Sequence, residues 1–155
     1  MSAARRAVPG DAEELVRLRK VMLDAMSPSD DVRWQPLTAE TLRARLADPD
    51  GELTAFVVDA PDGRPGLAAC AAGTVNHSLG SPGNPTGTSG HVFNVCTDPV
   101  HRRRGYSRAC VEALLDWYRA HGVARVDLFA TAAGEPLYAA LGFERTPAPS
   151  MRLTL

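Results

Sequence analysis

The sequence predicts an α+β fold that forms one domain over residues 1–155. The 155 residues are 45% hydrophobic and 23% charged, which is ordinary for a globular domain. Runs rich in β-branched residues occur among segments of helical periodicity, in the order strand, two helices, three strands, helix, strand, helix and two strands. We therefore expect a sheet flanked by helices, with roughly two thirds of the unfolded surface buried.

The N-terminal segments are typical of a short strand and two helices. A strand over Arg5–Val8 precedes Pro9-Gly10-Asp11, which begins a helix whose apolar residues share one face: Leu15, Leu18, Met22 and Met26. A polar loop covers residues 27–36. Thr38 is expected to cap the second helix, which ends at Asp48-Pro49 because the residue before proline disfavours helix.

Two strands and an irregular segment follow. Strands over Glu52–Asp59 and Leu67–Asn76 are joined by Pro61-Asp62-Gly63-Arg64, a composition typical of a hairpin turn. Leu79–Gly90 is rich in glycine and proline, which excludes both a helix and a central strand. We interpret this segment as a connector, with a lid over a substrate as the functional alternative.

An arginine-rich turn joins the fourth predicted strand to a long helix. His91–Thr97 is rich in strand formers, Asp98-Pro99 ends the strand, and helical periodicity begins after Arg102-Arg103-Arg104-Gly105. The unpaired N–H groups and positive dipole of a helix start bind phosphate. The helix ends at Gly122, and the chain continues as a strand from Arg125, a short helix around Tyr138, and strands over Phe143–Thr146 and Met151–Leu155.

The pattern Arg102-x-x-Gly105-x-Ser107 after a strand resembles the acetyl-CoA signature of the GNAT superfamily of N-acetyltransferases. In that signature, Arg or Gln, two spacers, Gly, one spacer and Gly or Ala wrap the pyrophosphate. Ser107 departs from the last position but is still small. The resemblance implies that the pyrophosphate is held by the segment Arg102, Arg103, Arg104, Gly105, Tyr106, Ser107 and Arg108.

A second match to the same family lies downstream. Tyr138 is followed after three residues by Gly142-Phe143, and in the family this tyrosine donates a proton to the leaving CoA thiolate. Thr131 stands where many members have an Asn that touches pantetheine. The resemblance also implies a strand bulge whose N–H groups bind the oxyanion, at Val95, Cys96 and Thr97. The base is either His91 or an ordered water, and a nucleophilic role for Cys96 is the less favoured alternative.

The resemblance covers nearly the whole chain and implies a fold and a reaction. The sheet is expected to be twisted, mixed and mostly antiparallel, and splayed between the fourth strand, ending at Thr97, and the fifth, from Arg125. Acetyl-CoA enters that gap and serves as cosubstrate, with no metal. The implied reaction is direct attack on the thioester by a primary amine in a ternary complex. The alternative is a non-catalytic acyl-CoA-binding regulatory domain.

Composition also limits the partners. The net charge of −1 and an aromatic content of 6% argue against a nucleic-acid module. Met1–Arg6 lacks the apolar core of a signal peptide, and no apolar run approaches the ~18 residues of a membrane span, so we expect a cytoplasmic protein. The acceptor is an amine of a small molecule or a protein. Many relatives pair through a sheet edge or the final strands, so a homodimer is the candidate assembly.

Overall fold

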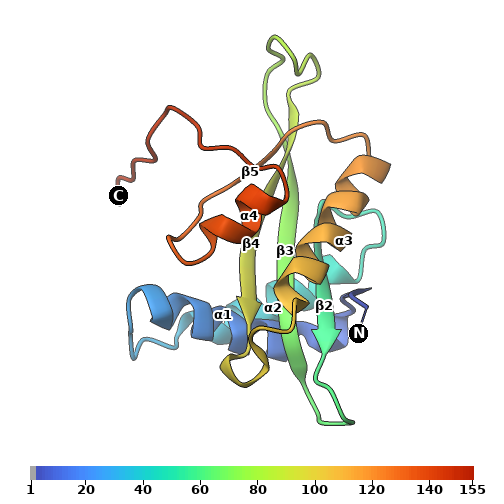
Figure 1. Cartoon of the computed structure of the whole chain (residues 1–155), viewed down its shortest axis with the longest axis vertical. Helices are drawn as coiled ribbons and strands as arrows, with labels where there is room; N and C mark the ends of the chain where they lie inside the picture. Colours follow the sequence, from blue (N-terminus) through green and yellow to red (C-terminus); the bar gives the residue numbers. More distant parts are fainter. Residues whose placement is uncertain (1–2) are drawn as a thin grey trace.

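A five-stranded sheet forms the centre of the computed structural model, which describes residues 3–155 (Figure 1). The strands lie in the order β1-β2-β3-β4-β5. Neighbours are antiparallel except β4 and β5, which are parallel. The expected α+β class with a mixed, mostly antiparallel sheet is therefore confirmed. The strand bounds are β1 Arg5–Arg6, β2 Leu53–Asp59, β3 Leu67–His77, β4 Thr88–Thr97 and β5 Val126–Leu128.

Helices cover both faces of this sheet (Figure 1). The helices α1 (Ala12–Met26) and α2 (Trp34–Leu46) pack on one face, and α3 (Tyr106–Ala120) and α4 (Glu135–Ala140) lie on the other. Two short 3-10 turns, Pro9–Asp11 and Pro99–His101, precede α1 and α3. No helix in residues 3–155 has the length and apolar character needed to cross a membrane.

The small residues of β3 allow helices to approach the sheet from both sides. Its first seven residues, from Leu67 to Gly73, are all buried. Cys70 and Ala72 belong to the core beneath α1 and α2, whereas Ala69 and Ala71 belong to the core beneath α3. Alanine has a low β-propensity, so burial between two layers explains why this segment is a strand.

Tyr118 of α3 fixes that helix against β3 and β4. Its hydroxyl donates to the carbonyl oxygens of Thr74, at 2.9 Å, and His91, at 3.2 Å. The ring lies so close to the sheet that a Cβ on Gly73 would be 2.2 Å from the Tyr118 hydroxyl, and one on Gly90 would be 2.6 Å from the ring. Only glycine allows this approach, which holds β4 in place just before the strands separate.

Several predicted boundaries were wrong. The helix α2 begins at Trp34 rather than after Thr38, because Pro36 lies in the first turn, where no N–H is needed. The Thr38 hydroxyl donates instead to the Trp34 carbonyl, at 2.8 Å. The strand β4 begins at Thr88, so residues 79–87 are the tip of the β3–β4 hairpin. The segments 143–146 and 151–155 form no strand.

Candidate active site

The sheet opens between β4 and β5, as the family resemblance implies. The paired residues are Gly90 with Val126, His91 with Asp127 and Val92 with Leu128. Beyond Val92, β4 continues to Thr97 without a partner on that side, because β5 ends at Leu128. Backbone N–H groups that this part of β4 directs toward the gap are therefore not used by the sheet.

A bulge in β4 lies inside this opening. The pairing of β4 with β3 passes from Phe93 opposite Ala72 to Cys96 opposite Cys70, so Asn94 and Val95 both face Ala71. Asn94 has a φ of 54°, a left-handed conformation that asparagine tolerates better than most residues. Its carbonyl accepts a hydrogen bond from the Cys70 thiol, at 3.1 Å. Val95, expected among the oxyanion-binding residues, is thus part of the bulge.

The arginine-rich turn leads from the end of β4 into the start of α3. Arg103 and Gly105 have positive φ values of 64° and 76°, and Gly105 is the N-cap residue of α3. Arg102, Arg103, Arg104 and Arg108 are exposed. No side chain caps α3, so the N–H groups of its first turn are available to an anion.

Two side chains connect the bulged strand to this helix start. The hydroxyls of Thr97 and Ser107 share a hydrogen bond, which fixes the last residue of β4 against the first turn of α3. Arg108 forms an ion pair with Glu112 one turn later, at 2.9 Å. Tyr106 is buried in the core beneath α3. The Tyr106 side chain therefore packs in the core, whereas its backbone N–H is one of the uncapped N–H groups at the start of α3.

Tyr138 lies half-buried on α4, on the same side of the sheet as α3. Its ring contacts Phe143 edge to face, with a centroid distance of 5.9 Å. Burial raises the pKa of the Tyr138 phenol above its ordinary value, so the hydroxyl keeps its proton at neutral pH. Thr131 stabilises the turn before α4, since its Oγ1 accepts from the Gly134 N–H at 3.1 Å.

His91 projects from the opposite face of β4. It stacks on Phe93 at a centroid distance of 6.2 Å and meets Phe129 edge to face at 5.5 Å. Phe93 packs with the core beneath α1 and α2, and alternate strand residues share a face. The imidazole therefore lies beside the gap but on the α1–α2 side, across the sheet from Tyr138.

Cys96 does not have the environment of a nucleophile. The residue is buried in the core beneath α1 and α2, and this burial raises the pKa of its thiol. A thiol with a raised pKa holds less of the reactive thiolate at neutral pH. Cys70 and Cys110 are also free and buried. Residues 3–155 contain no group of three or more His, Cys, Asp or Glu side chains placed to hold a metal ion.

A cleft of about 330 Å³ adjoins the bulge, and sequence reasoning missed the residues that form it. Phe93 and Asn94 of β4 line one side, and these are the first residues of β4 beyond its pairing with β5. Arg19 of α1 reaches the same place and donates to Asn94 Oδ1 at 3.2 Å. The remaining lining residues come from α1, α2, β2 and β3: Leu15, Leu37, Thr38, Thr41, Leu42, Leu53 and Ala72.

The predicted site residues thus fall into two groups, one on each side of the sheet. Tyr138 lies on the α3–α4 side, and the pyrophosphate segment at residues 102–108 surrounds the start of α3. His91 lies on the α1–α2 side, near the cleft. The bulge at Asn94 and Val95 lies on the strand between them.

Comparison with known proteins identifies the family. Residues 18–143 match the acetyltransferase (GNAT) family, and the chain belongs to it. As a member of this family the protein is an acetyltransferase. This range includes both motifs that resemble the family, Arg102–Ser107 and Tyr138–Phe143, so the resemblance is confirmed. No curated protein matches the chain.

Solved structures share the whole fold. A predicted acetyltransferase from Clostridium acetobutylicum, solved with acetyl-CoA, is 22% identical over 99% of this chain and 96% of that one, with a TM-score of 0.84. A GCN5-related N-acetyltransferase from Ralstonia eutropha JMP134 is 26% identical over 99% of both chains, with a TM-score of 0.82. Glucosamine-6-phosphate N-acetyltransferase from Arabidopsis thaliana is 15% identical over 99% of this chain and 98% of that one, with a TM-score of 0.76.

Proposed function

We propose that the protein transfers the acetyl group of acetyl-CoA to the nitrogen of a primary amine, by direct attack within a ternary complex. The observation that carries the proposal is the arrangement along β4. The strand bulges where it leaves β5, and its last residue, Thr97, is bonded to Ser107 in the uncapped first turn of α3. A phosphate-binding element and a group of free strand N–H donors therefore lie at one end of the same strand.

The start of α3 fits the pyrophosphate of acetyl-CoA. Its first-turn N–H groups have no side-chain cap, and a Cβ placed on Gly105 would meet no atom within 4 Å, so the approach to the helix end is open. Arg102, Arg103 and Arg104 supply positive charge beside it, and the helix dipole favours an anion at the same point. Thr131 is assigned to the pantetheine arm.

The bulged strand is assigned to the oxyanion. As the amine nitrogen bonds to the carbonyl carbon, negative charge develops on the carbonyl oxygen and needs a fixed donor. The N–H groups of Val95, Cys96 and Thr97 are the candidates, because β4 has no partner on its β5 side from Phe93 onward. Donors already fixed by the sheet need no reorganisation during the reaction.

Tyr138 is assigned as the general acid. When the tetrahedral intermediate collapses, the carbon–sulfur bond breaks and the electron pair remains on sulfur, which takes the phenolic proton. A tyrosine phenol already holds this proton at neutral pH, and burial, which raises the pKa of Tyr138, acts in the same direction. The side chain lies on the α3–α4 side of the sheet with the proposed pyrophosphate site.

The proton that the amine loses goes to His91 or to an ordered water. His91 is half-buried between Phe93 and Phe129, next to the gap and on the side of the cleft. An imidazole is suited to accept a proton near neutral pH. If His91 is the base, His91→Gln should lower kcat with Kd for acetyl-CoA unchanged, whereas catalysis through water alone should leave kcat unchanged.

Release of CoA thiol with and without amines tests the proposal. The experiment incubates the protein with acetyl-CoA and a panel of primary amines and follows free thiol. We expect release that depends on an amine and saturates with it. Binding of acetyl-CoA with no release under any amine would instead identify the alternative, a non-catalytic acyl-CoA-binding regulatory domain.

The proposal includes a homodimer and a cytoplasmic location. Met151, Leu153 and Leu155 are exposed by 81% or more, and β5 pairs only with β4 among the described residues. An alternating apolar segment and an open strand edge are complementary between two copies. The three cysteines are all free, which is typical of proteins in a reducing compartment.

A further inference from the structure

The cleft adjoins the β4 bulge, to which the proposed function assigns the oxyanion. It is formed between the sheet and the pair α1 and α2, and it includes Phe93 and Asn94, where β4 leaves β5. Its volume of about 330 Å³ falls at the lower end of the ~300–1,000 Å³ typical of small-molecule sites. The space therefore suits a whole small molecule rather than a protein surface.

Arg19 is the one charged side chain among the described residues that line this cleft. It is half-buried, and its guanidinium donates a hydrogen bond to the neutral Asn94 Oδ1, at 3.2 Å. Arg17, two residues earlier on α1, pairs with Glu14 and Asp98, each at 2.7 Å. No acid within residues 3–155 forms such a pair with Arg19. Because a guanidinium has five N–H donors, most of its bonding capacity is unused.

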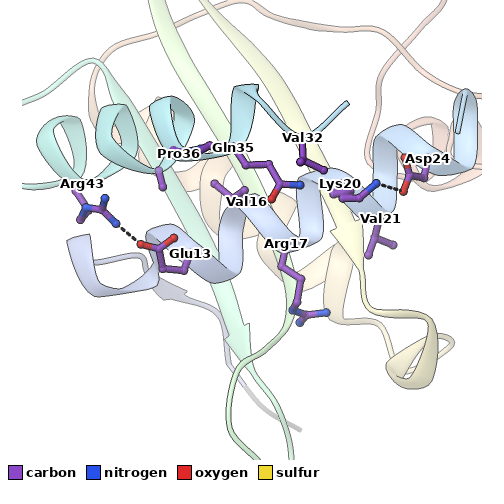
Figure 2. A pocket seen from close by; sticks show the side chains of 11 residues that line it. Glu13, Val16, Arg17, Lys20, Val21, Asp24, Val32, Gln35, Pro36 and Arg43 are labelled. Atoms are coloured by element: carbon purple, nitrogen blue, oxygen red, sulfur yellow. Dashed lines mark hydrogen bonds and ion pairs between the residues drawn. The ribbon is translucent and has the colours of Figure 1, made fainter. Parts of the chain in front are cut away.

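A second, larger hollow lies between α1 and α2, and its cations, unlike Arg19, are paired with carboxylates (Figure 2). It measures about 700 Å³, but each cation that lines it is paired with a carboxylate. Arg43 is bonded to Glu13, and Lys20 to Asp24 at 2.6 Å. An anionic ligand there would have to displace a carboxylate. In the cleft beside the bulge, Arg19 has no carboxylate partner that an anionic ligand would have to displace.

We infer that the acceptor is a small primary amine that carries a carboxylate close to the reacting nitrogen, and that Arg19 binds this carboxylate; the inference rests on the proposed amine acetylation. The guanidinium is bonded to the bulge residue itself, so an anion on Arg19 holds a nearby amine close to the bulge. Leu15, Leu42 and Leu53 form apolar walls of the cleft, which favours an acceptor with an apolar side group.

A carboxylate fits this cleft better than a phosphate group. The planar fork of arginine binds a carboxylate through two parallel hydrogen bonds. One guanidinium balances the single charge of a carboxylate, whereas a phosphate near −2 would leave uncompensated charge among apolar walls. Apolar α-amino acids combine the three required groups, so leucine is a suitable probe.

The test compares leucine with leucinamide, which lacks the negative charge and keeps the amine and side group. In the wild-type protein we expect a higher kcat/KM for leucine. In Arg19→Met, the ratio of leucine to leucinamide kcat/KM should fall by about 100-fold, the effect of losing two hydrogen bonds to a charged group. Arg19→Lys should retain part of the preference, because the charge remains and the fork is lost.

Arg43→Met is the matched control, since it removes an arginine that lies outside the cleft and is paired with Glu13. Its leucine-to-leucinamide ratio should equal that of the wild type. Equal ratios in the wild type and Arg19→Met would overturn the assignment of Arg19 while leaving amine acetylation established. No acetylation of any amine by a protein that binds acetyl-CoA would overturn the proposed function, and this inference with it.

Discussion

Gly105→Val tests two roles of Gly105, its left-handed backbone conformation and the binding of acetyl-CoA at the start of α3. Gly105 has a φ of 76°, and a Cβ there would meet no atom within 4 Å. Valine therefore finds space but strains the left-handed backbone, at about 1–3 kcal/mol. For a domain of this size each kcal/mol lowers Tm by about 2–4 °C. The variant should fold, with a moderately lower Tm.

The substitution should also weaken acetyl-CoA binding, which backbone strain in the folded protein does not do by itself. Gly105 is the N-cap residue of α3, so we expect a side chain added there to crowd an anion bound at the uncapped first turn. A hydrogen bond to a charged group contributes about 1.5 kcal/mol or more. Losing two of them to the pyrophosphate costs about 3 kcal/mol, which weakens Kd about 100-fold. Isothermal titration with acetyl-CoA measures this change.

Gly122→Val at the other end of α3 is the control for backbone strain. Gly122 has a φ of 71°, and a Cβ there also meets no atom within 4 Å. Its Tm should fall by a similar amount, with Kd for acetyl-CoA unchanged. A wild-type Kd in folded Gly105→Val, or equal losses of affinity at both positions, would remove the pyrophosphate from the start of α3.

Three further predictions follow from the same structure. Tyr138→Phe keeps the ring that contacts Phe143 and should lower kcat about 100-fold with unchanged Kd for acetyl-CoA; wild-type kcat with chemistry rate-limiting would leave Tyr138 only a packing role. Replacing residues 79–87 by a short Gly-Ser turn should leave both KM values within about twofold, because this tip lines neither hollow; a change in amine selectivity would instead indicate a lid. We propose a homodimer, so light scattering should find a dimer for the whole chain and a monomer once residues 151–155 are removed; an unchanged mass would exclude this segment from the interface.

The strand, turn and helix around the pyrophosphate segment could be predicted because their signals are local. Asp98-Pro99 ends β4, and Gly105 allows the left-handed residue that begins α3. These features involve only neighbouring residues, so the sequence determines them directly. The separation of β4 from β5 came instead from the family resemblance, and the end of pairing at Val92 and Leu128 confirms it.

The final segments show the limit of a periodic pattern. Met151, Leu153 and Leu155 alternate as in a strand, yet residues 151–155 have no strand partner. Alternation indicates which side chains would share a face, but a strand also requires a neighbouring edge for its hydrogen bonds. That edge depends on the position of distant residues and cannot be derived from five residues alone.

The cleft was missed for the same reason. Arg19 and Asn94 are 75 residues apart in the chain, and neither has a distinctive local pattern. Arg19 is one arginine in a charged helix, and Asn94 is one polar residue within a strand. Their importance emerges only when the bulge turns Asn94 toward α1, where its side chain accepts the Arg19 bond.

The fate of the acetyl group tests the central claim most directly. The protein is incubated with acetyl-CoA labelled in the acetyl group and with leucine, and the product is treated with neutral hydroxylamine, which cleaves esters and thioesters but not amides. Nitrogen acetylation predicts label in a hydroxylamine-resistant amide, with one CoA thiol released for each amide formed. Label recovered as free acetate whether or not an amine is present, or as a hydroxylamine-sensitive product, would contradict it.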